Sequence, residues 1–123
     1  MKKTTLSTQQ FEPREGYERA VIFTSDDFGN NTKLQLMRLG PGMNIRPHYH
    51  NVRTECFRII SGEGKILIDG DVVATSPDDM VICAPGEVHE FVNLSDSEHF
   101  YFQVIRTNDP KDNDMIWVKE DNS

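Results

Sequence analysis

Short apolar runs are the feature of this sequence that most limits its fold. From Arg19 onward these runs are rich in Val, Ile, Phe and Thr, and clusters of Gly, Pro, Asn and Asp separate them. A strand needs only a few residues, whereas an amphipathic helix needs a sustained 3.6-residue period, which no segment offers. The pattern predicts an all-β sandwich or barrel, with strands near residues 19–24, 33–39, 44–50, 54–60, 65–68, 71–75, 80–83, 88–93, 99–105 and 115–118.

The turns between the expected strands are specific in places. Asp69-Gly70 separates two runs and predicts a tight hairpin, because both central residues of a type I′ turn need a positive φ. Residues 1–17 are polar and show no period, which is typical of a tail or an edge strand. Residues 107–123 begin with a polar, Asp-rich loop and then offer one more short apolar run, so we expect a C-terminal strand or tail.

Charge and segment lengths exclude several classes of protein. The 123 residues carry a net charge of −7, the wrong sign for a nucleic-acid-binding surface. The longest apolar run extends only from Met80 to Ala84, far short of the ~20 residues of a membrane-spanning helix. Thr4 to Gln10 is polar and does not resemble a secretory signal, so we expect a cytoplasmic protein with Cys56 and Cys83 as free thiols.

Three histidines and a glutamate form the pattern that carries chemistry. His48 and His50 are one residue apart within an expected strand, so both imidazoles point to the same face. Glu55 follows after a short turn, and His89 lies in a later strand that a closed sheet could bring to the same interior. Imidazole nitrogen favours divalent transition metals such as Fe, Mn, Ni, Zn, Co or Cu over Mg or Ca. The alternative is that the H-x-H pair lies on the surface by chance and that His89 is a hydrogen-bonded core residue.

The residues resemble a known family. Gly42-x5-His48-x-His50-x4-Glu55-x6-Gly62 is similar to the first cupin motif, and Gly86-x2-His89-x3-Asn93 is similar to the core of the second. The second motif departs from the family at Asp78, where a Gly is usual, and at Ala84, where a Pro is usual. The resemblance implies a cupin-type double-stranded β-helix, or jelly-roll barrel, over residues 18–106. It also implies a metal held in the barrel mouth by His48, His50, Glu55 and His89.

Four protein ligands on a metal that prefers six would leave two positions for a substrate. Arg46 shares the strand parity of His48 and His50, so it could point inward and clamp a carboxylate or enolate; its alternative place is the solvated rim. No catalytic acid or base is identifiable. His99 and Tyr101 share one face of their strand, and strand parity alone leaves open whether that face is interior.

Three functions follow from these residues and from the resemblance. The first is a metal-dependent enzyme acting on a small polar organic molecule, with dioxygenation preferred and decarboxylation or lyase chemistry as alternatives. The second is a non-catalytic module that binds a metabolite and uses the metal as a structural staple. The third is a sugar isomerase or epimerase, which would need an interior base such as His99 or Tyr101. We expect a small-molecule substrate, no nucleic-acid or membrane partner, and a homodimer.

Overall fold

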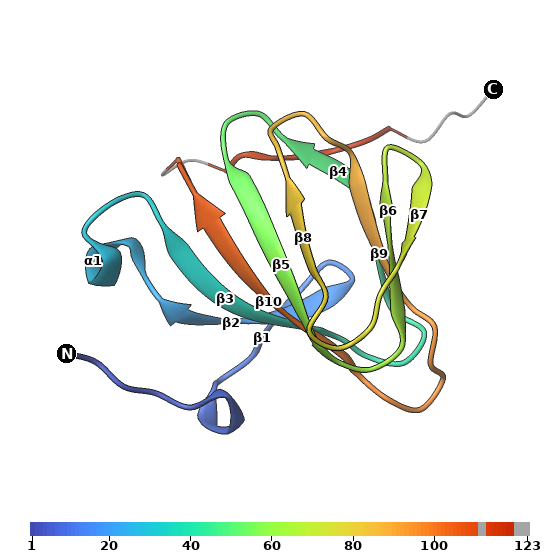
Figure 1. Ribbon diagram of the computed structural model, residues 1–123, viewed down its shortest axis with the longest axis horizontal. Coiled ribbons are helices and arrows are strands. Elements are labelled where there is room, and N and C mark those ends of the chain that lie inside the picture. The colour runs from blue at the N-terminus through green and yellow to red at the C-terminus, as the bar shows by residue number, and fades with distance from the viewer. Residues whose placement is uncertain (111–112, 120–123) are drawn as a thin grey trace.

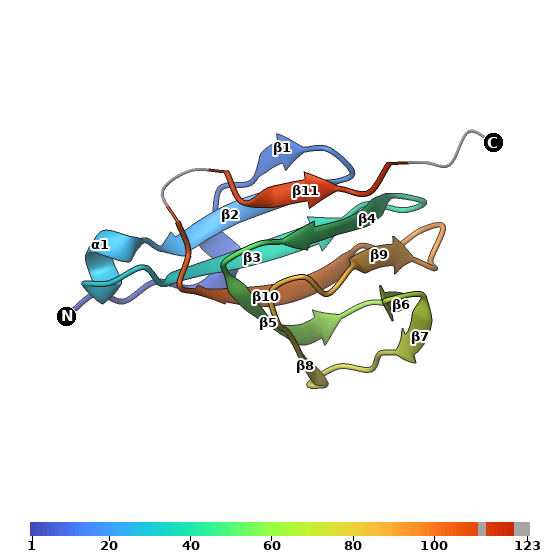
Figure 2. The ribbon, with the colours of Figure 1, turned by 90° about the horizontal axis from the view of Figure 1, so that it is seen from above.

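Two antiparallel sheets face each other and enclose the core (Figures 1 and 2). The computed structural model describes residues 1–110 and 113–119. One sheet has the strand order β1-β2-β3-β10-β5-β8 and the other has the order β11-β4-β9-β6-β7. The strands are β1 (Glu12–Arg14), β2 (Tyr17–Phe23), β3 (Lys33–Leu39), β4 (Asn44–His50), β5 (Thr54–Ser61), β6 (Gly64–Ile68), β7 (Asp71–Ala74), β8 (Met80–Cys83), β9 (His89–Asn93), β10 (Phe100–Thr107) and β11 (Met115–Trp117).

The expected all-β architecture is confirmed, and each expected strand has a counterpart between β2 and β11. β2 starts earlier than expected, at Tyr17, which is buried in the core. The hairpin between β6 and β7 is confirmed as well. Asp69 has a φ of 49° and Gly70 a φ of 85°, the positive values that a type I′ turn requires. Ile68 and Asp71 pair directly across it.

The N-terminal segment adds an edge strand and two short helical turns. β1 pairs with β2 at the edge of its sheet, and η1 (Leu6–Thr8) precedes it. α1 (Ser25–Phe28) was not expected from the sequence, because one turn is too short to show a helical period. It is stabilised by a capping box in which the Thr24 hydroxyl accepts from the Asp27 N–H and the Asp27 carboxylate accepts from the Thr24 N–H. Neither described helix has the length and apolar character needed to cross a membrane.

Aromatic side chains fill one end of the space between the sheets. Phe100, Phe102 and Val104 of β10 are fully buried, which identifies their face of the strand as the interior one. The rings of Phe91 and Phe102 stack across the two sheets with centroids 4.6 Å apart. Gly64 is required here, because a Cβ at this position would overlap the Phe100 ring.

Candidate metal centre

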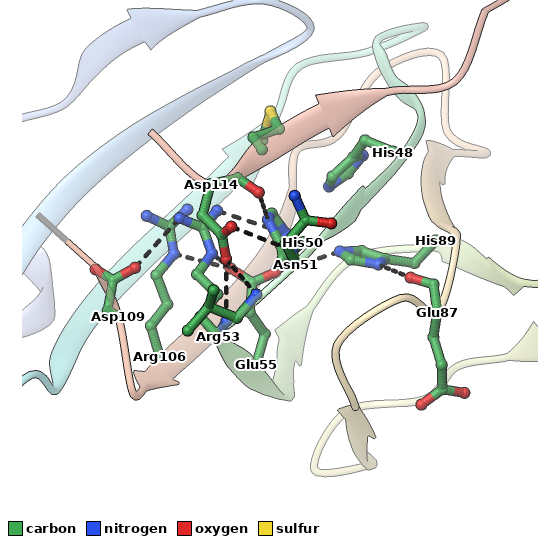
Figure 3. Close-up of polar contacts among 12 residues, drawn as sticks. His48, His50, Asn51, Arg53, Glu55, Glu87, His89, Arg106, Asp109 and Asp114 are labelled. Atoms are coloured by element: carbon green, nitrogen blue, oxygen red, sulfur yellow. Dashed lines mark hydrogen bonds and ion pairs between the residues drawn. The ribbon is translucent and has the colours of Figure 1, made fainter. Parts of the chain in front are cut away.

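The three imidazoles expected to share a site converge inside the barrel (Figure 3). His48 and His50 lie on the inner face of β4, and His48 is the direct cross-strand partner of His89 on β9. Glu55 reaches the same place from β5 in the opposite sheet. The four residues are only 1–3% exposed. Strand alternation therefore delivers all four side chains to the interior.

Each imidazole presents a ring nitrogen toward the centre of the group. One ring nitrogen from each of the three lies within 4.8 Å of the others. The Nδ1 atoms face backbone carbonyl oxygens: His48 that of Arg46 at 2.9 Å, His89 that of Glu87 at 3.0 Å, and His50 that of Asp114 at 3.3 Å. A carbonyl oxygen only accepts, so each Nδ1 donates to it, and each Nε2 is left pointing toward the centre of the group. Backbone contacts of this kind orient metal-binding histidines.

The Glu55 carboxylate lies against the imidazole group. Its Oε1 atom lies 2.9 Å from Nε2 of His50 and 3.2 Å from Nε2 of His89. These contacts are hydrogen bonds when the Nε2 atoms carry protons, and a metal ion bound between the same atoms would replace those protons. Buried nitrogen donors with one carboxylate suit a divalent transition metal. The residues present therefore fit the metal that the cupin motifs imply.

Burial and neighbouring charges shift the pKa values of two of these groups. Burial by itself raises the pKa of Glu55, but hydrogen bonds with His50 and His89 and the charge of Arg106 outweigh it, and the pKa is well below its usual range. Burial, together with the adjacent His89, lowers the pKa of His48 to about 3. The site thus favours an ionised carboxylate and a neutral imidazole at His48, which are the protonation states that bind metal.

Two buried arginines behind Glu55 were missed by sequence reasoning. Nε of Arg106 lies 2.8 Å from Oε2 of Glu55, and Nε of Arg53 lies 3.3 Å from the same oxygen. Arg53 also contacts Asp109 at 3.3 Å. Arg106 shares the inner face of β10 with Phe102, so only knowledge of which face is interior could have found it. Arg53 belongs to the turn before β5, where the sequence carries no sign of burial.

Asp114 was missed as well, and it organises the turn between the ligands. Its carboxylate accepts hydrogen bonds from the backbone N–H groups of Asn51, Val52 and Arg53 at 2.9–3.2 Å. Its backbone oxygen faces Nδ1 of His50. One residue from the Asp-rich segment near the C-terminus therefore fixes both the turn after β4 and the orientation of a ligand. Residues 111–112 and 120–123, which belong to the expected loop and tail, lie outside the described residues.

Of the two places left open for Arg46, the structure has the side chain at the rim and not inside the barrel beside His48. The pairing of β4 with β9 shifts register between Ile45 and His48, so β4 holds one extra residue and its alternation changes face. The Arg46 side chain is 41% exposed, bonds to Glu15 at 3.0 Å and lies over the Trp117 ring at 4.3 Å from its centroid. That Arg46 contacts the substrate stays a prediction, and from its observed position the contact would be made at the rim of the barrel.

His99 and Tyr101 lie outside the barrel. Tyr101 alternates with the buried Phe100 and Phe102 and packs edge-on against Phe11 of the N-terminal segment. The His99 ring lies 5.7 Å from the Tyr101 ring, on the same outer side. Neither residue can serve as an interior base for isomerisation.

Comparison with known proteins agrees with the fold. A family model described as the cupin domain matches residues 35–105. No curated protein matches the chain. A predicted oxalate decarboxylase from Thermotoga maritima is 21% identical with a TM-score of 0.77, over 85% of this chain and 97% of that one. The polyketide cyclase RemF from Streptomyces resistomycificus is 19% identical with a TM-score of 0.79, and the match covers 98% of this chain and 89% of RemF. Oxalate decarboxylase from Bacillus subtilis is 19% identical with a TM-score of 0.74, and the match covers 94% of this chain and 31% of the decarboxylase.

Fold and motifs together define an antiparallel β-barrel protein with an interior imidazole group. The chain belongs to the cupin family. Its fold is the jelly-roll barrel that the two motifs predict, and its three clustered histidines form a group able to hold a metal ion.

Proposed function

We propose that this cupin is a metal-dependent enzyme acting on a small polar organic molecule, with His48, His50, His89 and Glu55 as ligands of a divalent transition metal. The observation that carries the proposal is the convergence of three imidazole nitrogens, all within 4.8 Å of one another, beside the buried Glu55 carboxylate, whose Oε1 lies 2.9 Å from Nε2 of His50. The bound metal would supply Lewis-acid polarisation of a substrate oxygen. Its identity among Fe, Mn, Ni, Zn, Co and Cu is left to experiment.

The chain's own residues prepare the site for such chemistry. The backbone carbonyl oxygens that accept from Nδ1 fix the imidazole rings, so little reorganisation is needed when the ion binds. Phe57 and Trp117 flank the imidazoles, with ring centroids 5.7 Å from His89 and 5.3 Å from His48 respectively. The space beside His48 and Glu55 measures about 10 Å³, roughly enough for one water molecule. This exclusion of water strengthens electrostatic interactions with a bound oxygen atom.

An oxygen-dependent reaction is the preferred chemistry. Glu55 is already bound by two arginines, and Tyr17, which borders the same small space, offers only a phenol. Among the described residues, then, the interior lacks a free general base at the imidazole group. Dioxygen chemistry depends mainly on the metal and has the least need of a general base, whereas isomerisation requires one.

Decarboxylation or a related lyase reaction is the second candidate. It is supported by the buried arginines beside the site and by the oxalate decarboxylases among the similar structures. Oxygen dependence separates the two. Purified protein loaded anaerobically with Fe(II) and given a panel of organic acids should turn over only after oxygen is admitted. Equal turnover without oxygen would favour decarboxylase or lyase chemistry instead.

Metal content tests the site itself. The protein is purified, stripped with a chelator, dialysed against each metal and examined by elemental analysis. We expect one metal ion per chain, and we expect His48→Ala combined with His50→Ala to abolish it. His99→Ala is the matched control and should retain full stoichiometry. Unchanged metal in the double variant would refute the ligand assignment, and a four-coordinate zinc without exchangeable water would favour the non-catalytic module. The homodimer stays a prediction.

A further inference from the structure

An arginine-lined cavity opens beside the candidate metal centre. It has a volume of about 380 Å³ and lies between β11 and the β1–β2 hairpin, which run along one edge of the molecule in Figure 2. Arginine side chains from four places in the sequence border it, and aromatic rings form part of its wall. The residues that matter here are Arg14, Arg19, Arg53, Arg106, Tyr17 and Trp117. In a chain of net charge −7, such a concentration of positive charge is local.

The acidic residues around this cavity do not neutralise its arginines one for one. Glu12 is shared between Arg14 at 3.1 Å and Arg19 at 2.9 Å. Glu55 is likewise shared between Arg53 and Arg106. Arg53 has a second partner in Asp109, and Glu15 pairs with Arg46. The surplus positive charge therefore lies at the end where Glu12 faces both Arg14 and Arg19. A concave surface of one sign concentrates ligands of the opposite charge.

Two of the arginines keep unused hydrogen-bond donors although they are buried. Arg53 and Arg106 are each only 5% exposed. Nε of Arg53 makes no hydrogen bond, since its 3.3 Å contact with Glu55 is an ion pair without hydrogen-bond geometry. Arg106 donates through Nε to Glu55, and its two terminal nitrogens, which face the cavity, make no hydrogen bond to another described residue. A buried donor such as Nε of Arg53 destabilises a fold when it is left without a hydrogen bond, and a bound ligand could supply that bond.

The cavity also communicates with the imidazole group. Tyr17, Arg106 and Met115 border both the arginine-lined cavity and the small space beside His48 and Glu55. A molecule held by Arg106 therefore lies next to the proposed ligands. The planar fork of arginine matches a carboxylate, as the existing contacts with Glu12 and Glu55 already illustrate.

We propose that this cavity binds a small organic acid, with its carboxylate on Arg106 and Arg19 and its remaining oxygen atoms directed to the imidazole group. The inference rests on the proposed function for what happens at the metal, and it names the substrate class of that site. Binding of the acid to the arginines itself requires no metal.

Trp117 permits a direct test, because it is the only tryptophan of the chain and it borders the cavity. Chelator-stripped protein is titrated with succinate while Trp117 emission is recorded. Succinamide serves as the uncharged analogue, and inorganic phosphate and sulfate serve as the other anions. We expect a saturable change with succinate and none with succinamide. Arg19→Gln and Arg106→Gln should each weaken succinate binding at least tenfold, and Arg58→Gln, an exposed arginine paired with Asp78, should leave it unchanged.

Arg19→Gln keeps the test decisive if Arg106→Gln does not fold, since Arg19 is partly exposed and its one ion pair within the described part of the chain is with the exposed Glu12. Equal responses to succinate and succinamide, stronger binding of phosphate or sulfate, or insensitivity to Arg19→Gln would each overturn the inference. Zinc binding is measured on the same preparations by equilibrium dialysis. If the protein binds zinc but not succinate, the organic-acid site alone is refuted. If it binds succinate but no metal, the proposed metalloenzyme is refuted instead.

Discussion

The two ends of the barrel interior are built from opposite kinds of side chain. One end is closed by rings such as Phe91, Phe100 and Phe102, which are at most 2% exposed and need no partner beyond contact. The other end buries three imidazoles, a carboxylate and two guanidinium groups. Burial of apolar rings stabilises the fold, whereas buried charges at best compensate one another. The apolar end therefore stabilises the fold, and the fold keeps the charged side chains of the other end in position.

The largest effect is expected at the apolar end. Phe102→Ala removes a ring that stacks on Phe91 and should lower the free energy of unfolding by about 3–5 kcal/mol. The folded variant should still bind one metal ion per chain, because no ligand is touched. Urea unfolding and elemental analysis measure the two quantities. Phe28→Ala, at an exposed ring, is the control and should stay within about 0.5 kcal/mol of the parent. If Phe102→Ala lost its metal but kept its unfolding free energy, the apolar end would not be the one that stabilises the fold.

Breaking the ion pairs at the charged end is the next test. Glu55→Gln removes the charge that compensates Arg53 and Arg106, so we expect the metal-free protein to lose about 3 kcal/mol of unfolding free energy. Metal affinity should fall as well. Glu90→Gln, on the outer face of β9, is the control at a glutamate outside the ion-pair group. If Glu55→Gln left the free energy of unfolding unchanged or raised it, the charges of Arg53 and Arg106 would not need compensation by this carboxylate.

Acid should destabilise the metal-free protein through His48. Its pKa is about 3 in the fold and near the ordinary 6.5 in the unfolded chain. Between these values the unfolded chain binds more protons, so stability is full above pH 6.5 and falls as the pH drops toward 3. We expect a loss of about 2 kcal/mol between about pH 7 and about pH 5. Urea unfolding with chelator measures it. His48→Asn should flatten the dependence, and His99→Asn should leave it as in the parent.

The smallest effect is expected at the turn that joins the ligands. Asp114→Ala removes the acceptor for three backbone N–H groups and should cost about 1 kcal/mol of unfolding free energy. Because the turn orients His50, we expect metal affinity to fall about tenfold, measured by competition with a chelator. Asp96→Ala, in an exposed loop, is the control. Unchanged affinity would show that the carboxylate supports only the turn.

Much of the fold was predictable because its signals are local. Alternation within short runs located the strands, and Asp69-Gly70 identified a hairpin from two residues. Alternation also placed His48 and His50 on one face, a prediction that needs no partner strand. It failed for Arg46, because the bulge in β4 arises from pairing with β9. It was silent on Arg106, because alternation divides a strand into two faces without saying which one is inside.

The sequence by itself determined the all-β class, the shared face of His48 and His50, and the local charge and turn chemistry, since these depend on residues that are neighbours in the chain. Only the tertiary structure decided that β5 and β9 bring Glu55 and His89 to that face. It alone also assembled the arginines of the cavity, from four separate places in the chain. The reason is physical: a site built across two sheets depends on strand order and register, which are set by packing and not by spacing along the sequence.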